Sequence, residues 1–237
     1  MKIVNLIFVC FVLLSCKQPD VNPTSTSSPS HLNQAISGLR FLALGDSYTI
    51  GQSVEEVDRW PNQLAKKLEN FKIEVDEVDI IAQTGWTTSN LKNAVSVEKP
   101  DSNYDMVALL IGVNNQFQGR SIEEYSVEFE ELLVTAIALA KGDKNRVFVV
   151  SIPDYGYTPF GAASQENISK ALDKFNAVNE EITKRHKVDY HNITDISREG
   201  LDDPSLVASD KLHPSGQQYR QWVARFDADV ASQIKKW

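Results

Sequence analysis

Three residues that could together perform nucleophilic catalysis lie in predicted loops of this chain: Ser47, Asp210 and His213. Ser47 ends a Gly-Asp-Ser turn that directly follows the apolar run 39–44, and open α/β sheets carry their chemistry just past the carboxyl ends of strands. A serine becomes a nucleophile when a base takes its proton, a carboxylate orients that base and donors stabilise the oxyanion. Because Gly-Asp-Ser is also ordinary turn chemistry, the rest of the chain must supply those groups.

Of the four histidines, only His213 lies in a predicted loop beside a carboxylate. The others lie in the polar N-terminal stretch, at a predicted helix end and in a predicted strand: His31, His186 and His191. Asp210 precedes His213 by three residues, so within one tight loop its carboxylate can accept the Nδ1 proton and leave Nε2 facing Ser47. The alternative is that Asp210 only caps a turn before the last helix.

The elements that must position these residues alternate between strand and helix five times. Apolar runs predict strands at 39–44, 71–82, 104–111, 146–152 and 188–193. Helical spacing of apolar residues predicts helices at about 59–70, 88–99, 121–141, 164–186 and from 215 onward. Two strands lack polar alternation, which is typical of strands covered on both faces. The pattern predicts a three-layer α/β/α sandwich around a five-stranded parallel sheet.

Parallel strands end at one shared edge of a sheet, so residues just past several strands should meet there. Ser47, Gly85, Asn114 and Tyr155 each follow a predicted strand. We therefore expect these four residues to converge on one rim, close to the loop that carries His213.

Four short motifs, in this order, resemble those of the SGNH or GDSL-type hydrolases. They are Gly45-Asp46-Ser47, Gly85, Gly112-Val113-Asn114 and Asp210-Lys211-Leu212-His213. The resemblance covers nearly the whole domain and implies the flavodoxin-like SGNH hydrolase fold, with acyl esters cleaved through an acyl-enzyme intermediate and without cofactor or metal. It further implies that Ser47 is the nucleophile, His213 the base and then acid, and Asp210 its orienting carboxylate.

The same resemblance implies an oxyanion hole made of the backbone N–H of Ser47, the backbone N–H of Gly85 and the side-chain amide of Asn114. Two positions depart from the family pattern. Tyr48 stands where the family usually has Leu, and Asn115 stands where it usually has Asp. Neither carries a reacting group in this scheme, so the departures bear on the shape of the rim.

Four aromatic residues of the rim loops are expected to bind substrate as an apolar or sugar-stacking wall: Trp86, Tyr155, Tyr157 and Phe160. The alternative is that some of them only pack over the sheet edge. Esterases, thioesterases, lysophospholipases and carbohydrate deacetylases share the four motifs, so the motifs leave the ester open. A rival function is a non-catalytic SGNH-like module that binds envelope glycan.

The N-terminal segment has the features of an export signal. Lys2 precedes the apolar stretch 3–14, which is short for a membrane span, and Leu13-Leu14-Ser15-Cys16 resembles the lipobox of bacterial lipoproteins. We therefore predict a signal peptide at 1–15, a lipidated Cys16 with a disordered tether over 16–37, and a hydrolase domain at 38–237. The protein would be lipid-anchored in the bacterial cell envelope; a plain secretory signal is the alternative.

Charge disfavours some partners. The formal net charge is −8, and the 24 lysines and arginines are scattered along the chain. This pattern argues against nucleic acid and against electrostatic docking on anionic lipid. The expected partners are a small-molecule, glycan or lipid ester and a membrane reached through the lipid anchor.

Overall fold

The computed structural model describes residues 35–237; the predicted signal peptide, Cys16 and the tether up to residue 34 lie outside them. One sheet holds five parallel strands in the order β2-β1-β3-β4-β5. The strands are β1 (Ile36–Gly45), β2 (Ile73–Ala82), β3 (Met106–Leu110), β4 (Val147–Val150) and β5 (Asp189–His191). The predicted five-stranded parallel sheet is confirmed, and its order is that of flavodoxin-like folds.

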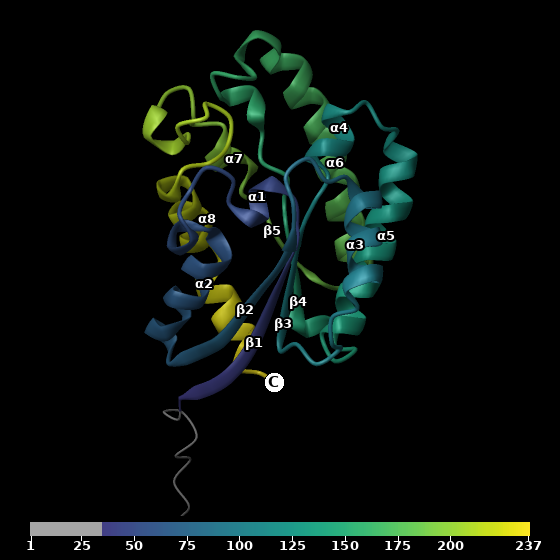
Figure 1. The fold of residues 1–237 in the computed structure, drawn as a ribbon, viewed down its shortest axis with the longest axis vertical. Helices are drawn as coiled ribbons and strands as arrows, with labels where there is room; N and C mark the ends of the chain where they lie inside the picture. Colours follow the sequence, from purple (N-terminus) through teal and green to yellow (C-terminus); the bar gives the residue numbers. More distant parts are fainter. Residues whose placement is uncertain (1–34) are drawn as a thin grey trace, which may run out of the picture. The chain divides into compact units, whose positions relative to one another are not determined.

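Helices cover both faces of the sheet (Figure 1). One face carries α2 (Trp60–Leu68) and α8 (Gly216–Ile234), and the other carries α3 (Thr88–Glu98), α5 (Ile122–Leu139) and α6 (Gln165–Arg185). This split follows from right-handed crossovers, because the chain leaves β1 toward β2 on one side and later returns to β3 on the other. Within residues 35–237, no helix combines the length and apolar character needed to cross a membrane.

The core lies between the sheet and these helices. Every residue of β3 and β4 is buried, as expected for strands covered on both faces. Trp60 of α2 is fully buried and packs against Phe41, Phe148 and Phe226, with ring centroids 6.1, 6.3 and 6.2 Å away. Each large apolar side chain buried in this way stabilises the fold by about 1.5–3 kcal/mol.

The register of the parallel strands places the carboxyl ends of β1, β2 and β3 side by side at one edge of the sheet. Gly45 at the end of β1 lies opposite Ala82 of β2 and Leu110 of β3. Short helices that the sequence patterns did not predict begin at this edge: α1 (Ser47–Ile50), α4 (Val113–Phe117) and α7 (Thr194–Ser197). Figure 1 shows all three at the same end of the sheet. The strand order reverses between β1 and β3, which is where such sheets bind ligands.

Strand boundaries differ from the predicted ones by a few residues. The first strand starts at Ile36 rather than after the expected tether, because the backbone N–H of Ile36 donates to the carbonyl of Lys72 at 2.9 Å. Strand β2 starts at Ile73 rather than 71, since a 3₁₀ turn (Glu69–Phe71) precedes it. Pairing with a neighbouring strand, which no local pattern encodes, sets these ends.

Candidate active site

A sharp turn positions Ser47 as the first residue of α1, directly past β1. The Asp46 side chain accepts the backbone N–H of Tyr48 at 3.0 Å and so caps the helix. A Cβ on Gly45 would lie 2.5 Å from the carbonyl oxygen of Leu110 in the neighbouring strand. Only glycine therefore allows the chain to turn this closely against β3, and the turn holds Ser47 at the end of the sheet.

Asp210 and His213 form a compact loop in which the carboxylate binds the imidazole. Asp210 Oδ2 lies 2.6 Å from His213 Nδ1, and Oδ1 accepts the backbone N–H groups of Leu212 and His213, each at 2.9 Å. Partial burial of the Asp210 carboxyl raises its pKa, but hydrogen bonds from Ser53, the backbone and His213 outweigh burial and lower the pKa to about 2. Asp210 is thus ionised at neutral pH and can stabilise a protonated imidazole.

Tyr48, one of the two departures from the family pattern, packs against the imidazole. Its ring meets that of His213 edge-on, with centroids 5.5 Å apart and an interplanar angle of 61°. The Tyr48 ring also lies 6.5 Å from the Trp222 ring of α8. The buried Tyr48 side chain therefore contacts both His213 and α8.

One cavity of about 240 Å³ joins the predicted site residues. Ser47 and His213 both line it, together with Gly85 and Asn114. Within residues 35–237 no hydrogen bond joins Ser47 to His213, and such contacts are often loose before substrate binds. The remaining lining residues are mostly apolar: Tyr48, Thr84, Val113, Phe117, Tyr155, Phe160 and Leu212.

Asn114 and Gly85, the expected side-chain donor and one of the expected backbone donors, are each held by a hydrogen bond to a nearby residue. Asn114 Nδ2 donates to the carbonyl of Trp86 at 3.0 Å, which uses one of its two N–H groups and leaves the other for a ligand. Gly85 has φ +85°, and its carbonyl accepts from Gln118 at 3.2 Å. A Cβ at this glycine would meet no atom within 4 Å, so glycine is required by the backbone angle and not by space.

Asn115, the second departure, has a structural role. It is fully buried; its Oδ1 accepts the backbone N–H of Thr88 at 3.0 Å, and its Nδ2 donates to Thr88 Oγ1 at 2.7 Å. Since the Thr88 hydroxyl itself donates to Glu128, it needs a donor from position 115 that a carboxylate lacks. Asn115 thus ties α4, which carries Asn114, to the start of α3.

The structure brings two of the four predicted aromatic residues to the cavity. Tyr155 and Phe160 line it and form a cluster with Phe117, with ring centroids 6.0–6.3 Å apart. Trp86 and Tyr157 do not line it: Trp86 packs against the core, and the Tyr157 ring lies 6.0 Å from the Arg198 guanidinium. Their expected part in substrate binding stays a prediction.

Phe117 was missed by the sequence patterns, although a signal exists. It follows Asn114 by three residues, so a helix over this segment puts both on one face. The sequence patterns predict only the end of a strand here, because five residues are too few to show helical periodicity.

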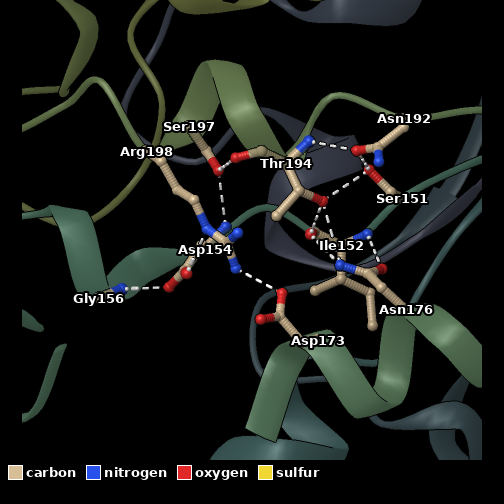
Figure 2. Close-up of polar contacts among 10 residues, drawn as sticks. All are labelled: Ser151, Ile152, Asp154, Gly156, Asp173, Asn176, Asn192, Thr194, Ser197 and Arg198. Atoms are coloured by element: carbon tan, nitrogen blue, oxygen red, sulfur yellow. Dashed lines mark hydrogen bonds and ion pairs between the residues drawn. The ribbon is translucent and has the colours of Figure 1, made fainter. Parts of the chain in front are cut away.

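A half-buried ion pair between Asp154 and Arg198 helps to hold the loop that carries Tyr155 and Phe160 (Figure 2). The fully buried Asp154 side chain accepts the Gly156 N–H at 2.9 Å and Arg198 Nε at 3.0 Å. The Arg198 guanidinium also reaches Asp173 of α6 at 2.5 Å. Further along the loop, the Phe160 N–H donates to the carbonyl of Lys211 at 3.1 Å. The cavity wall is therefore joined both to the protein body and to the His213 loop.

Past the end of β4, backbone groups that no longer pair with a neighbouring strand are hydrogen-bonded by polar side chains instead (Figure 2). Asn176 of α6 bonds both backbone groups of Ile152, at 2.8 and 2.9 Å. Ser197 Oγ accepts the Asp154 N–H at 2.7 Å. Buried backbone groups require such partners, so this network determines the path of the chain into the cavity wall.

No group of three or more His, Cys, Asp or Glu side chains in the described part of the chain is arranged to hold a metal ion.

The family model for the GDSL-like lipase/acylhydrolase family matches residues 43–221 of this chain. No curated protein is similar enough in sequence to count as a match. Among solved structures, a lipolytic G-D-S-L family protein from Veillonella parvula is similar with a TM-score of 0.62 and 16% identity, covering 80% of this chain and 96% of its own.

Two further structures are similar at the same level. A lipase/acylhydrolase from Enterococcus faecalis has a TM-score of 0.60 and 18% identity over 82% of this chain and 96% of its own. Axe2, an acetylxylan esterase from Geobacillus stearothermophilus, has a TM-score of 0.62 and 19% identity over 82% of this chain and 95% of its own. At these identities the similarity establishes a shared fold.

Proposed function

The chain belongs to the GDSL-like lipase/acylhydrolase family, and from that premise we propose that it hydrolyses acyl esters with Ser47 as nucleophile, His213 as general base and acid, and Asp210 as the carboxylate that orients His213. The main support for this proposal is that Ser47 and His213 line the same cavity, while Asp210 lies 2.6 Å from His213 Nδ1 and so occupies that nitrogen. That contact leaves Nε2 as the free nitrogen of the ring.

The proposed reaction has two halves. His213 Nε2 takes the Ser47 hydroxyl proton as Oγ bonds to the acyl carbon, and the resulting tetrahedral oxyanion collapses. The ester C–O bond then breaks, and the alcohol leaves with the proton returned by Nε2. A water molecule next attacks the acyl-enzyme with the same base, which releases the acid and restores Ser47. Asp210 stays ionised throughout, as its low pKa allows.

The oxyanion would be held by the backbone N–H groups of Ser47 and Gly85 and by Asn114 Nδ2. Three features support this assignment: all three residues line the cavity, Gly85 has a backbone angle that favours glycine, and Asn114 keeps one N–H unused. Neutral donors stabilise the developing charge without altering the charge of His213.

The cavity favours an apolar acyl group longer than acetyl. Apolar and aromatic side chains line it beside Ser47, among them Phe117, Tyr155, Phe160 and Leu212. Because an alkyl chain gains free energy for each methylene group that it buries against such walls, longer acyl chains should bind better here than acetyl.

The test is hydrolysis by the full chain and by Ser47→Ala. The substrates are p-nitrophenyl esters from acetyl to dodecanoyl, an acyl thioester, a lysophospholipid and acetylated xylan. We expect Ser47-dependent hydrolysis that is fastest on an ester whose acyl chain is longer than acetyl. A maximum at acetyl would refute the acyl assignment alone, and no Ser47-dependent hydrolysis of any substrate would favour the glycan-binding module.

We also propose that the chain is exported and anchored in the cell envelope through lipid on Cys16. Support comes from the sequence of residues 2–16 alone, because this segment lies outside the described residues. Cys16→Ser should release the protein from the membrane fraction; retention there would refute the lipid anchor.

A further inference from the structure

We infer that Gln52 and Ser53 are positioning residues. They hold the acid loop (Asp210–His213) and the oxyanion loop (Thr84 and Gly85) at fixed places around Ser47. Ser53 Oγ donates to Asp210 Oδ2 at 2.6 Å, and Gln52 Oε1 accepts from Thr84 Oγ1 at 2.6 Å. These two consecutive side chains thus reach segments 157 and 32 residues away. The inference rests on the proposed function of the same site.

The turn that carries them is built directly onto the nucleophile helix. Helix α1 ends at Ile50 with Gly51 as its C-cap, and the Gln52 N–H donates to the carbonyl of Ser47 at 3.0 Å. Ser53 has φ +68°, a left-handed conformation that is unfavourable for serine and ordinary for glycine. In this conformation the Ser53 hydroxyl reaches the carboxylate of Asp210, so the side chain has a defined contact at the proposed site.

Ser53 completes the hydrogen bonding of the Asp210 carboxylate. Oδ1 accepts two backbone N–H groups, and Oδ2 accepts both His213 Nδ1–H and the Ser53 hydroxyl. These four hydrogen bonds hold the carboxylate in place beside the imidazole. The Ser53 bond also weakens Asp210 as a base, so its removal should strengthen the pull of Asp210 on the imidazolium.

Other ionisable groups face His213 from the elements around it. Tyr48 of α1 lies against the ring, Tyr155 shares the main cavity, and Asp154 shares a small void with His213. None of the three contacts Ser53 in the described chain, so their effect on His213 should be equal with and without the Ser53 hydroxyl. If a Ser53 variant shifts the acidic limb of the plot of kcat/KM against pH, the shift can then be assigned to the changed Asp210 carboxylate.

Gln52 acts on the other loop. Thr84 directly precedes Gly85 and lines the cavity itself. By accepting the Thr84 hydroxyl, Gln52 holds the backbone that must present the Gly85 N–H to the oxyanion. Loss of this contact should lower turnover without changing the charge balance at His213.

The experiment compares Ser53→Ala, Ser53→Gly and Gln52→Ala in the full chain, using the pH dependence of kcat/KM, which reports the free enzyme. Both Ser53 variants should lose about tenfold in kcat/KM, the scale of one hydrogen bond to a charged group, and shift the acidic limb to higher pH. Gln52→Ala should lower kcat and leave the limb unshifted.

Glycine separates the side chain from the backbone, because it accepts φ +68° without cost. If the loop conformation alone matters, Ser53→Gly will match the wild type while Ser53→Ala does not, and the inference fails for Ser53. Ser205→Ala is the matched control. This serine also donates to an aspartate, Asp203 at 2.5 Å, but it does not line the cavity and belongs to neither of the two loops. Its removal should leave kcat/KM and the limb unchanged.

The outcomes distinguish the two proposals. Activity that survives Ser47→Ala refutes the proposed function. An inactive Ser47→Ala combined with Ser53 variants of wild-type rate and profile refutes the positioning role of Ser53 alone. A Gln52→Ala variant with wild-type kcat does the same for Gln52.

Discussion

Replacing Asn114 by alanine should cost far more activity than stability. The side chain contributes one N–H to the carbonyl of Trp86 and, in the proposed reaction, the other to the oxyanion. Removing one oxyanion donor typically lowers turnover by about 10² to 10³, or on the order of 3 kcal/mol of barrier stabilisation. Losing the Trp86 contact should lower the free energy of unfolding by only about 1 kcal/mol.

The neighbouring residue supplies the matched control. Asn115→Ala removes two hydrogen bonds to Thr88 and leaves a buried backbone N–H unpaired. It should lower the free energy of unfolding by about 2–3 kcal/mol, more than Asn114→Ala does. Its effect on turnover should be much smaller, because Asn115 does not line the cavity.

The two variants are compared by steady-state kinetics on the best ester and by thermal unfolding. We expect opposite orders: Asn114→Ala the slower enzyme and Asn115→Ala the less stable protein. A folded Asn114→Ala variant with kcat within threefold of the wild type would refute the oxyanion assignment. Equal losses of kcat in both variants would show that α4 position, and not the Asn114 amide, controls turnover.

Three further predictions concern the cavity wall and the nucleophile turn. Phe160→Ala should raise KM for octanoyl esters about tenfold and leave acetyl esters unchanged; an unchanged chain-length profile would contradict the wall assignment. Arg198→Met leaves the buried Asp154 carboxylate without its cation and should flatten the same profile, whereas Arg225→Met, which breaks the exposed pair with Asp195, should not. Burial raises the pKa of Asp46 to about 7. The protonated Asp46 therefore contributes its full stability below its unfolded pKa of about 4, and this contribution is lost as the pH rises to 7. The wild-type Tm should fall over that range, and Asp46→Asn should abolish the fall. Parallel curves of Tm against pH for the two proteins would contradict this prediction.

Much of the fold could be predicted because it depends on local patterns. Five apolar runs alternate with five amphipathic stretches, and this alternation is enough to specify a parallel sheet covered by helices. The residues at strand ends then follow from geometry, since parallel strands end at one edge. Ser47, Gly85 and Asn114 could be placed together without knowledge of any side-chain contact. The loop from Asp210 to His213 was likewise readable, because three residues suffice to close it.

The sequence by itself determined the architecture and proposed the candidate reacting groups, since both depend on residue type, order and short spacing. Only the tertiary structure decided which neighbours hold those groups. Ser53 meets Asp210, Tyr48 meets His213 and Asn115 meets Thr88 across loops far apart in the chain. It also separated Tyr155 and Phe160, which line the cavity, from Trp86 and Tyr157, which do not. The physical reason is that side-chain direction within a loop depends on buried contacts such as Asp154 with Arg198, and these form only when distant segments pack.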